Sequence, residues 1–292
     1  MLIWEIIATG LTLGALYACG TLALSLVWGS VGMLNMAHGA VLVAGGYASY
    51  YAVTALGLPW WLGLPAGVLI GIVIGLILYA TLVRWMFTDP GFSVNILIAT
   101  IAAATLVEDL ITNLLGPVTR RQPFKLEGGI QFSDQFRLPN ETILVIAISA
   151  MLFVATHLLI NRTRLGRAIR AVAQQPTGAL LVGVPIQRTL AWVMVIAGAL
   201  GGGTGVLLTS LTTVYPGAGF DPLLKSLIIC VVGGLGSLNG AFIAALGLGM
   251  FESAVEYLTG QRFGFPAMLA LVIATLIIRP SGLIGRDETA RQ

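Results

Sequence analysis

The sequence predicts an all-α polytopic membrane protein with about eight transmembrane segments, some of them broken or re-entrant at glycine-rich motifs. Of the 292 residues, 57% are hydrophobic and only 9% are charged, whereas soluble domains carry roughly 25% charged residues. Several apolar runs approach the roughly 20 residues that a helix needs to cross a bilayer. None of these runs shows the alternating pattern of a membrane β-barrel. The 37 glycines suit helices that pack closely or break within the membrane.

The candidate spans together make a single transmembrane domain over residues 1–292. In chain order, their approximate bounds are 6–28, 37–56, 61–83, 93–115, 141–160, 189–212, 223–256 and 264–279. The first segment has no basic residue before it and carries Glu5. We therefore interpret it as a retained span and not as a cleaved signal peptide.

The connection at about 161–188 indicates the orientation of the chain. It contains several arginines and no acidic residue, which places it in the cytoplasm by the positive-inside rule. The loop at 116–140 carries acids as well as bases. Because one span separates the two loops, the second loop is expected to face outward. Arg279 and Arg286 indicate a cytoplasmic C-terminus.

These assignments are not consistent with eight full crossings. We expect residues 223–256 to form a re-entrant pair of half-helices that enters and leaves on the outer side. Irregular backbone at that depth is tolerated where protein or a cavity surrounds it. The prediction is then an outer N-terminus, seven full crossings and one hairpin.

The basic connection also contains a short amphipathic helix. At about 100° per residue, one face carries arginines and the opposite face carries aliphatic side chains. The basic face is Arg164, Arg167 and Arg170, and the apolar face is Leu165, Ile169 and Val172. Such a helix can rest on the transmembrane core and present its charges to a soluble partner.

A glycine-rich motif, G-x-x-G-x-L-N, occurs at residues 29–35 and again at 233–239. Transporters often contain two repeats whose broken helices meet within the bilayer. Paired glycines permit a break or a close helix contact, and Asn can bind the backbone groups that a break frees. Chance similarity between glycine-rich segments is the alternative. The residues assigned to broken helices on the translocation path are Gly29, Gly32, Asn35, His38, Gly39, Gly233, Gly234, Gly236 and Asn239.

Ionisable residues within the apolar runs support an alternative hypothesis, an ion-coupled secondary transporter of a small solute. Glu108, Asp109 and His38 are its candidate residues, because intramembrane ionisable groups are often functional. Structural explanations are also available: His38 could satisfy a broken helix end, and the two acids could reach the outer polar layer. Glu252 and Glu256, four residues apart, are explained most simply by a water-exposed helix face, with a cation site as the alternative.

Motifs for catalysis are absent from the sequence. It contains no G-x-x-x-x-G-K-[ST] phosphate-binding loop, no nucleophile with a base and no Cys/His spacing for a metal. The sequence therefore predicts a transport protein that is not an enzyme and has no cofactor or metal of its own. A scaffold that only recruits a partner is a third interpretation, but it leaves the paired glycine breaks unexplained.

Several stretches resemble the LivH-like permeases of branched-chain amino acid ABC importers. They are GLTLGALYA at 10–18, GMLNMAHG at 32–39 with GY at 46–47, GRAIRAVA at 166–173 with Gly183, and VGGLGSLNG at 232–240 with RPSGLIG at 279–285. The chain departs from the family's pattern at Ala40, where an acid is frequent. It also departs at 175–180, where QPTGAL replaces the usual Asp-Pro-Glu-Ala-Ala-Arg.

The resemblance implies a permease subunit that carries branched-chain or other hydrophobic amino acids, or a related small solute. Its implied partners are a second, LivM-like permease subunit, two cytoplasmic ABC ATPase subunits that bind ATP and Mg²⁺, an extracytoplasmic solute-binding protein and membrane lipid, with no nucleic acid. The implied location is the bacterial or archaeal cell membrane, which is the inner membrane in a Gram-negative cell. The basic segment then becomes the ATPase-coupling segment, with Arg164, Gly166, Arg167, Arg170, Gln174, Pro176 and Gly183 as its residues.

Overall fold

The computed structural model describes residues 2–88, 91–123, 128–133, 136–279 and 282–283, so Arg286 lies outside the described residues. The chain is almost entirely helical over these ranges, as predicted. The α-helices are α1 (Leu2–Val31), α2 (His38–Thr54), α3 (Gly63–Leu78), α4 (Arg84–Met86), α5 (Phe92–Leu115), α6 (Asn140–Arg162), α7 (Arg164–Gln174), α8 (Pro176–Leu181), α9 (Ile186–Leu211), α10 (Phe220–Gly233), α11 (Leu238–Thr259) and α12 (Gly264–Ile278).

Short segments of other geometry complete the fold. The 3-10 helices are Trp60–Leu62, Pro216–Gly219 and Gln261–Phe263, and a π-helical turn at Tyr79–Val83 joins α3 to α4. The strands are β1 (Arg120–Arg121), β2 (Gly129–Ser133), β3 (Phe136–Pro139) and β4 (Thr213–Val214). Antiparallel pairing joins β1 to β4 and β2 to β3. These ribbons connect helices and form no sheet-based core.

In the described chain, 8 helical segments are long and apolar enough to cross a membrane. They are Ile3–Val31, Trp60–Met86, Phe92–Leu115, Asn140–Arg162, Ile186–Leu211, Pro216–Gly233, Leu238–Thr259 and Gln261–Ile278. The prediction of a polytopic helical membrane protein is confirmed.

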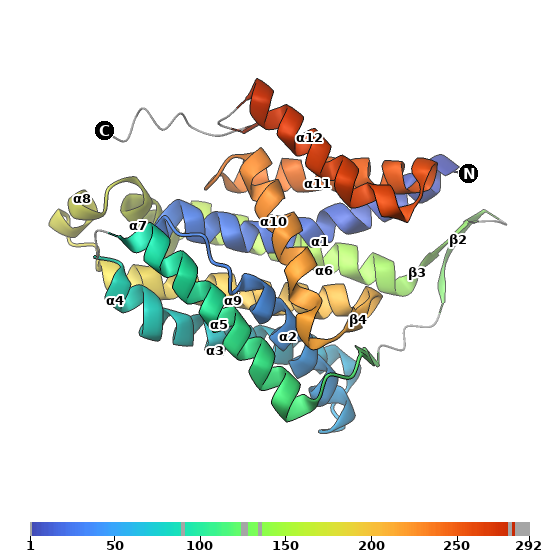
Figure 1. The fold of residues 1–292 in the computed structure, drawn as a ribbon, viewed down its shortest axis with the longest axis horizontal. Coiled ribbons are helices and arrows are strands. Elements are labelled where there is room, and N and C mark those ends of the chain that lie inside the picture. The colour runs from blue at the N-terminus through green and yellow to red at the C-terminus, as the bar shows by residue number, and fades with distance from the viewer. Residues whose placement is uncertain (1, 89–90, 124–127, 134–135, 280–281, 284–292) are drawn as a thin grey trace.

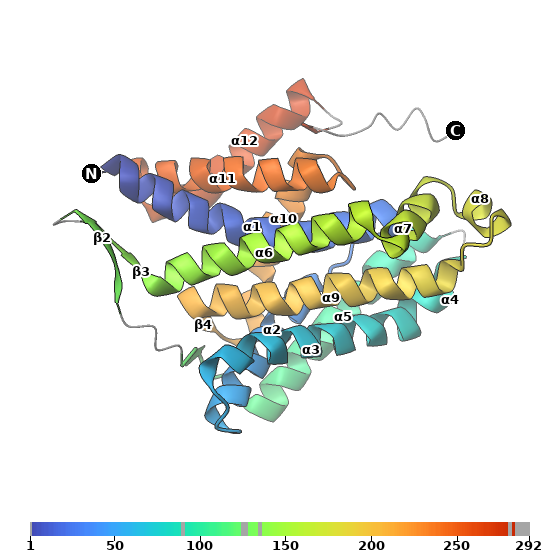
Figure 2. The same ribbon diagram turned by 180° about the vertical axis from the view of Figure 1, so that it is seen from behind.

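The long helices α1, α6, α9 and α11 run along the longest axis of the molecule, and α10 crosses them at a steep angle (Figures 1 and 2). Helices α7 and α8 lie at one end of this axis, which we call the α7 end. The β2–β3 ribbon and the start of α1 lie at the opposite end, which we call the ribbon end. The two polar connections on either side of α6 therefore lie at opposite ends, as predicted. That the α7 end faces the cytoplasm remains a prediction.

Helix α1 forms the centre of the bundle. Its most apolar window is 89% buried, because α6, α9, α10 and α11 surround it. Leu22 and Val27 of α1 pack with Leu190 and Met194 of α9 in the largest buried cluster. An all-round apolar helix of this kind is expected at the core of a membrane bundle.

Glycines hold α3 and α9 together. Gly67, Gly71 and Gly75 recur every fourth residue of α3, so they lie on one face. A Cβ atom on Gly71 would lie 3.0 Å from the Cα of Gly202 on α9, which leaves no room for a side chain. Close backbone approach of this kind provides the van der Waals contact that holds helices together in lipid.

The second predicted span, 37–56, is helical over His38–Thr54, but this helix does not start at the end of the bundle. Helix α1 ends at Val31, and Gly32 has a φ of +74°, which favours glycine. Residues 32–37 are not helical, and α2 begins at His38 beside Gly201 of α9. Gly201 precedes Leu211, the end of α9, by ten residues, or about 15 Å. Helix α2 thus begins well inside the bundle, after the chain has turned back from the α7 end.

The prediction that residues 223–256 form a hairpin that enters and leaves on the outer side is wrong, because the chain continues to the α7 end before it turns. The turn between α10 and α11 reaches the α7 end, where Gly236 packs on Gly29 near the end of α1. Helix α11 has 22 residues, or about 33 Å, which is enough to cross a hydrocarbon core of about 30 Å. Helix α11 is therefore a full crossing, whereas α10, with 14 residues, runs from inside the bundle, where Gly219 packs on Gly39, to the α7 end. A hairpin and this arrangement both return the chain to the ribbon end, so the predicted side of the C-terminus is unaffected. The side of the N-terminus does not depend on this region, and the start of α1 lies at the ribbon end, opposite α7.

Candidate functional site

The basic segment folds as two short helices attached to the end of α6. Thr163 begins α7 by accepting a hydrogen bond from the Gly166 amide, 3.0 Å away. A Cβ on Gly166 would lie 2.5 Å from the Leu159 carbonyl oxygen, so only glycine allows α7 to fold back this closely. Ile169 and Val172 are buried in the cluster that contains Val31. The apolar face of α7 therefore rests on the transmembrane core, as predicted.

The three arginines of α7 differ in their surroundings. Arg164 and Arg167 are exposed. Arg170 is half-buried, and its guanidinium donates a hydrogen bond to the carbonyl of Ile160 in the last turn of α6. A cation at that position also complements the negative end of the helix dipole. The structure thus leaves Arg164 and Arg167 exposed, whereas Arg170 holds α7 to α6.

Helix α8 projects furthest at the α7 end (Figure 1). Gln174 and Pro176 are exposed, and Gly183, with a φ of +82°, ends the helix in a turn. The apolar residues before this turn are unusually open: the exposed fractions are 59% for Leu180, 84% for Leu181 and 77% for Val182. The sequence analysis placed these residues in the connection at 161–188 but did not single them out as exposed apolar side chains.

The two glycine motifs lie against each other in the structure. A Cβ on Gly29 would lie 3.0 Å from the Cα of Gly236, so the two backbones can approach this closely only because neither residue has a side chain. Asn35 accepts a hydrogen bond from the Ala37 amide at 3.1 Å, as expected for a residue that satisfies a helix break. The contact between Gly29 and Gly236 lies near the α7 end, whereas Asn35 and Ala37 precede the start of α2 inside the bundle.

The break in the second motif is stabilised by a serine. Gly234 and Gly236 have φ values of +97° and +83°, and Gly233 packs against Gly240 as α10 turns into α11. The Ser237 hydroxyl accepts a hydrogen bond from the Gly240 amide at 3.1 Å, which caps α11. Asn239 is exposed. The expectation that Asn239 would satisfy the break is wrong, because Ser237 occupies the capping position.

His38 and Gly39 form the start of α2, which lies beside the start of α10 inside the bundle. A Cβ on Gly39 would lie 2.5 Å from the carbonyl oxygen of Gly219, the residue that precedes α10. His38 is 2% exposed and packs between Gly20 of α1 and Gly201 of α9. His38 is therefore a core residue in this conformation.

A buried ion pair joins α10 to α11. The Lys225 ammonium lies 2.5 Å from Glu252 Oε1, and the two side chains are 21% and 1% exposed. The hydroxyl of Tyr17 on α1 donates to Glu252 Oε2 at 2.7 Å and accepts from Lys225 Nζ at 2.8 Å. The expectation that Glu252 lies on a water-exposed helix face is wrong, because Lys225 and Tyr17 compensate its charge within the protein.

The residues proposed for ion coupling are not gathered into one site. Glu108 and Asp109 are exposed on α5, whereas His38 is enclosed by α1 and α9. Among the residues that the structure describes, no three His, Cys, Asp or Glu side chains are placed to hold a metal ion.

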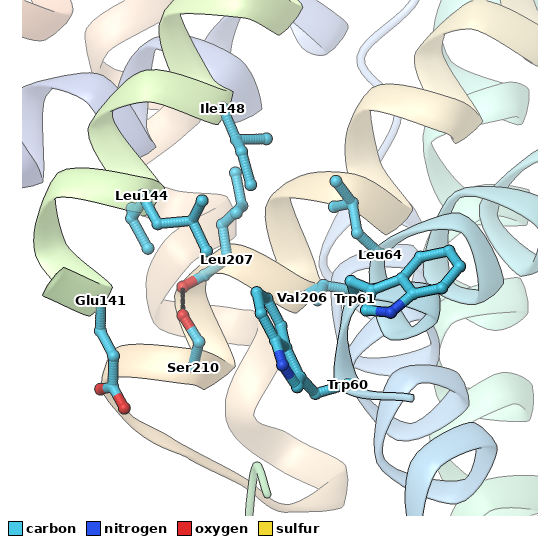
Figure 3. Close-up of a pocket in the computed structure, with 10 residues that line it drawn as sticks. Trp60, Trp61, Leu64, Glu141, Leu144, Ile148, Val206, Leu207 and Ser210 are labelled. Atoms are coloured by element: carbon cyan, nitrogen blue, oxygen red, sulfur yellow. Dashed lines mark hydrogen bonds between the residues drawn. The ribbon is translucent and has the colours of Figure 1, made fainter. Parts of the chain in front are cut away.

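An apolar pocket of ≈ 170 Å³ lies near the ribbon end between α3, α6 and α9. Figure 3 shows Trp60, Trp61 and Leu64 facing Leu144 and Ile148 across it. The hydroxyl of Ser210 donates to the Leu207 carbonyl at 2.7 Å, so this group is already paired. The pocket therefore suits hydrocarbon better than a charged solute.

Comparison with protein families identifies the chain. A family model described as "Branched-chain amino acid transport system / permease component" matches residues 6–279. The chain belongs to this family. It is accordingly a multi-pass protein of the cell membrane, and its relatives are transport subunits.

Two curated relatives match this permease over nearly their whole length. It is 30% identical to the high-affinity branched-chain amino acid transport system permease protein LivH of Salmonella typhimurium, over 97% of this chain and 95% of the relative. It is 27% identical to the corresponding protein BraD of Pseudomonas aeruginosa, over 98% and 96% of the two chains.

A solved structure has a similar fold. It is PsaBC from Streptococcus pneumoniae in complex with Fab, with a TM-score of 0.53 and 12% identity, over 96% of this permease and 93% of that chain. At this identity the similarity concerns the fold alone.

Sequence reasoning did not identify the Lys225–Glu252–Tyr17 cluster in this permease. The signal that was available is a lysine in the otherwise apolar segment 223–256, since an unpaired intramembrane ammonium is costly. Its acid partner could have been sought among Glu252 and Glu256. Tyr17 carries no signal in the sequence, because an aromatic residue in a span is ordinary.

Proposed function

We propose that this chain is the permease subunit of an ATP-driven importer of branched-chain or other hydrophobic amino acids. The observation that carries the proposal is the α7–α8 unit, which rests its apolar face on the core and extends beyond the spans. In this proposal, α7 and α8 form the coupling segment that docks on a cytoplasmic ATPase subunit and transmits its closure to α1 and α6.

The surface of this unit supports docking by a soluble protein. Arg164 and Arg167 are exposed on α7, and Leu180, Leu181 and Val182 form an exposed apolar cluster at the end of α8. Apolar side chains that extend beyond the spans gain free energy when a partner covers them. Charges around such a cluster provide specificity and steering. The loss of the two acids usual for the family at 175 and 177 makes the segment more basic, so a complementary ATPase groove would be acidic.

The importer requires further subunits. We propose a second, LivM-like permease subunit, two ABC ATPase subunits that bind ATP and Mg²⁺, and an extracytoplasmic binding protein that delivers the solute at the ribbon end. The chain has no phosphate-binding loop motif, so ATP hydrolysis is assigned to the ATPase subunits. The names of the curated relatives favour branched-chain amino acids as the solute.

Reconstitution tests the proposal. The complete set of subunits in proteoliposomes should accumulate radiolabelled leucine only when ATP and Mg²⁺ are supplied on the ATPase side. Leucine uptake that needs a proton or sodium gradient and no ATPase subunit would instead support the ion-coupled alternative.

A matched pair of variants tests the docking surface. Leu181→Asp should prevent co-purification of the ATPase subunits, because it places a charge in the apolar cluster. Leu56→Asp is the control, since Leu56 is 73% exposed in the connection between α2 and α3, away from α8. Equal ATPase retention in the two variants would contradict the assignment of α8 to coupling.

A further inference from the structure

The apolar pocket near the ribbon end lies between α3 and α6, two helices that both pack on α9. Val206 and Leu207 of α9 line it, and Leu64 of α3 faces Ile148 of α6 across it (Figure 3). The body of the pocket is therefore hydrocarbon contributed by three helices.

The pocket is closed toward the middle of the bundle. Gly203 precedes Val206 on α9 by about one turn, so it lies further from the ribbon end. A Cβ on Gly203 would lie 3.3 Å from Val68 of α3 and 3.6 Å from Leu152 of α6. Side chains of α3 and α6 thus meet over α9 beyond the pocket, and an occupant must extend from the ribbon end.

The helix surfaces on either side of the pocket are aliphatic and uncovered. Only 28% of the most apolar window of the span Trp60–Met86 is buried, and only 22% of that of Asn140–Arg162. Interfaces between membrane helices are enriched in small and polar residues. The large exposed side chains here include instead Leu69, Val73 and Ile77 of α3 and Met151, Val154 and Leu158 of α6. This surface suits lipid better than a second protein.

One end of the pocket is charged and aromatic. Glu141, in the first turn of α6, lines it together with Trp60 and Trp61, which precede α3. Tryptophan is typical of the level at which lipid headgroups meet hydrocarbon. Ile148 follows Glu141 by seven residues, or about 10 Å along α6. The lining therefore changes from a polar rim at the ribbon end to hydrocarbon within the bundle, as the two parts of a phospholipid require.

The carboxylate at this rim selects among headgroups. Glu141 is half-buried and has no ion-pair partner among the described residues. An ammonium group beside it would neutralise its charge, and the faces of indole rings attract the same cations. A headgroup with a net negative charge and no ammonium group would be repelled.

We infer that this pocket binds a phospholipid whose headgroup carries an ammonium group. One acyl chain occupies the space between Leu64 and Ile148, and the ammonium group lies beside the Glu141 carboxylate and the two indole rings. Zwitterionic phosphatidylethanolamine should therefore bind here in preference to anionic phosphatidylglycerol. The inference does not depend on which solute the transporter carries.

Photo-crosslinking of the permease, with its co-purifying subunits, in nanodiscs tests the site. The probe is phosphatidylethanolamine with a diazirine on one acyl chain, and peptide mass spectrometry locates the labelled residues. Labelling should concentrate within 141–148 and exceed that of Val154 and Leu158, further along the same helix. Unlabelled phosphatidylethanolamine should displace the probe about fivefold more effectively than phosphatidylglycerol, through one partly exposed ion pair and a cation–π contact.

Two matched pairs of variants separate a binding site from general solvation by lipid. Ile148→Trp fills the pocket and should reduce labelling of 141–148. Val154→Trp is its control, because Val154 is 51% exposed and does not line the pocket. Glu141→Gln should make the two lipids equally effective competitors, whereas Glu108→Gln on α5 should keep the preference for phosphatidylethanolamine.

Three results would each overturn the inference. Uniform labelling along α6 that Ile148→Trp does not change would show that lipid only solvates this face. No labelling of 141–148 would show that another protein segment covers the pocket. Equal displacement of the probe from the unaltered protein by the two lipids would show that the headgroup is not recognised. If Ile148→Trp does not fold, the competition in Glu141→Gln still decides.

Discussion

Lys225 on α10 and Glu252 on α11 form an ion pair inside the bundle, with 2.5 Å between Nζ and Oε1. Tyr17 closes this pair from α1 through hydrogen bonds to both partners. The cluster thereby joins three helices at one point. Helix α10 has only 14 residues, follows Gly219 and ends at Gly233. The ion pair with Glu252 and the hydrogen bond to Tyr17 attach this short helix to α11 and α1.

Lys225→Met should destabilise the protein strongly. The substitution leaves the Glu252 carboxylate buried without its counter-charge, which costs about 3–5 kcal/mol in buried ion pairs. The midpoint of thermal unfolding in detergent, followed by tryptophan fluorescence, should fall accordingly.

The double variant Lys225→Met with Glu252→Gln is the control for this prediction. It removes both charges and keeps similar volumes, so it should recover most of the lost stability. Equal destabilisation in the single and double variants would show that packing, and not charge compensation, dominates at this position.

Arg167→Glu and Arg170→Glu should affect different properties. Arg167 is exposed, so its reversal should uncouple ATP hydrolysis from uptake while the protein remains inserted and stable. Arg170 donates to the Ile160 carbonyl, and losing a charged hydrogen bond costs about 1.5–3 kcal/mol. Arg170→Glu should therefore also lower the unfolding midpoint. Full uptake in the double variant would contradict the role of α7 in coupling.

Gly236 and Gly32 should differ in their tolerance of substitution. A side chain on Gly236 would collide with the Cα of Gly29, whereas the space around Gly32 is open and only its φ of +74° matters. Gly236→Leu should therefore abolish uptake, and Gly32→Asn should be nearly neutral, since Asn tolerates this conformation. ATP-driven uptake in proteoliposomes checks both, and normal uptake by Gly236→Leu would rule out the close contact.

Ser237 and Asn239 provide a test of the cap of α11. Ser237→Ala removes the acceptor for the Gly240 amide and should cost about 0.5–2 kcal/mol of stability. Asn239→Ala should have little effect, because this side chain is exposed. Thermal unfolding of the two variants in parallel decides between them, and a larger loss for Asn239→Ala would contradict the assigned cap.

The helical fold was predictable because the signals for spans are local. Apolar runs near the length of a bilayer and the one-sided charge of 161–188 depend only on neighbouring residues. The same local signals misjudged residues 223–256, because a glycine break within an apolar run is compatible with a hairpin that turns within the membrane or with a turn at the far end of the bundle. The contact of Gly236 with Gly29, far away in the chain, decides between these alternatives.

The amphipathic pattern of α7 likewise predicted its buried face but not the separate role of Arg170. A helical wheel places three arginines on one arc, yet only the packing of α7 against α6 brings one of them to the Ile160 carbonyl. For the candidate site, the sequence therefore identified the arginines of α7 but not which of them contacts α6.

By itself, the sequence determined that this is a helical membrane protein with a basic amphipathic segment between spans, because composition and periodicity act over short distances. The tertiary structure alone decided that Lys225 compensates Glu252, that the two glycine motifs touch, and that Glu108 of α5 lies beside Gly217, just before α10. Each of these relationships joins residues from different helices. Their energies depend on distance and burial in three dimensions, which the order of residues along the chain does not specify.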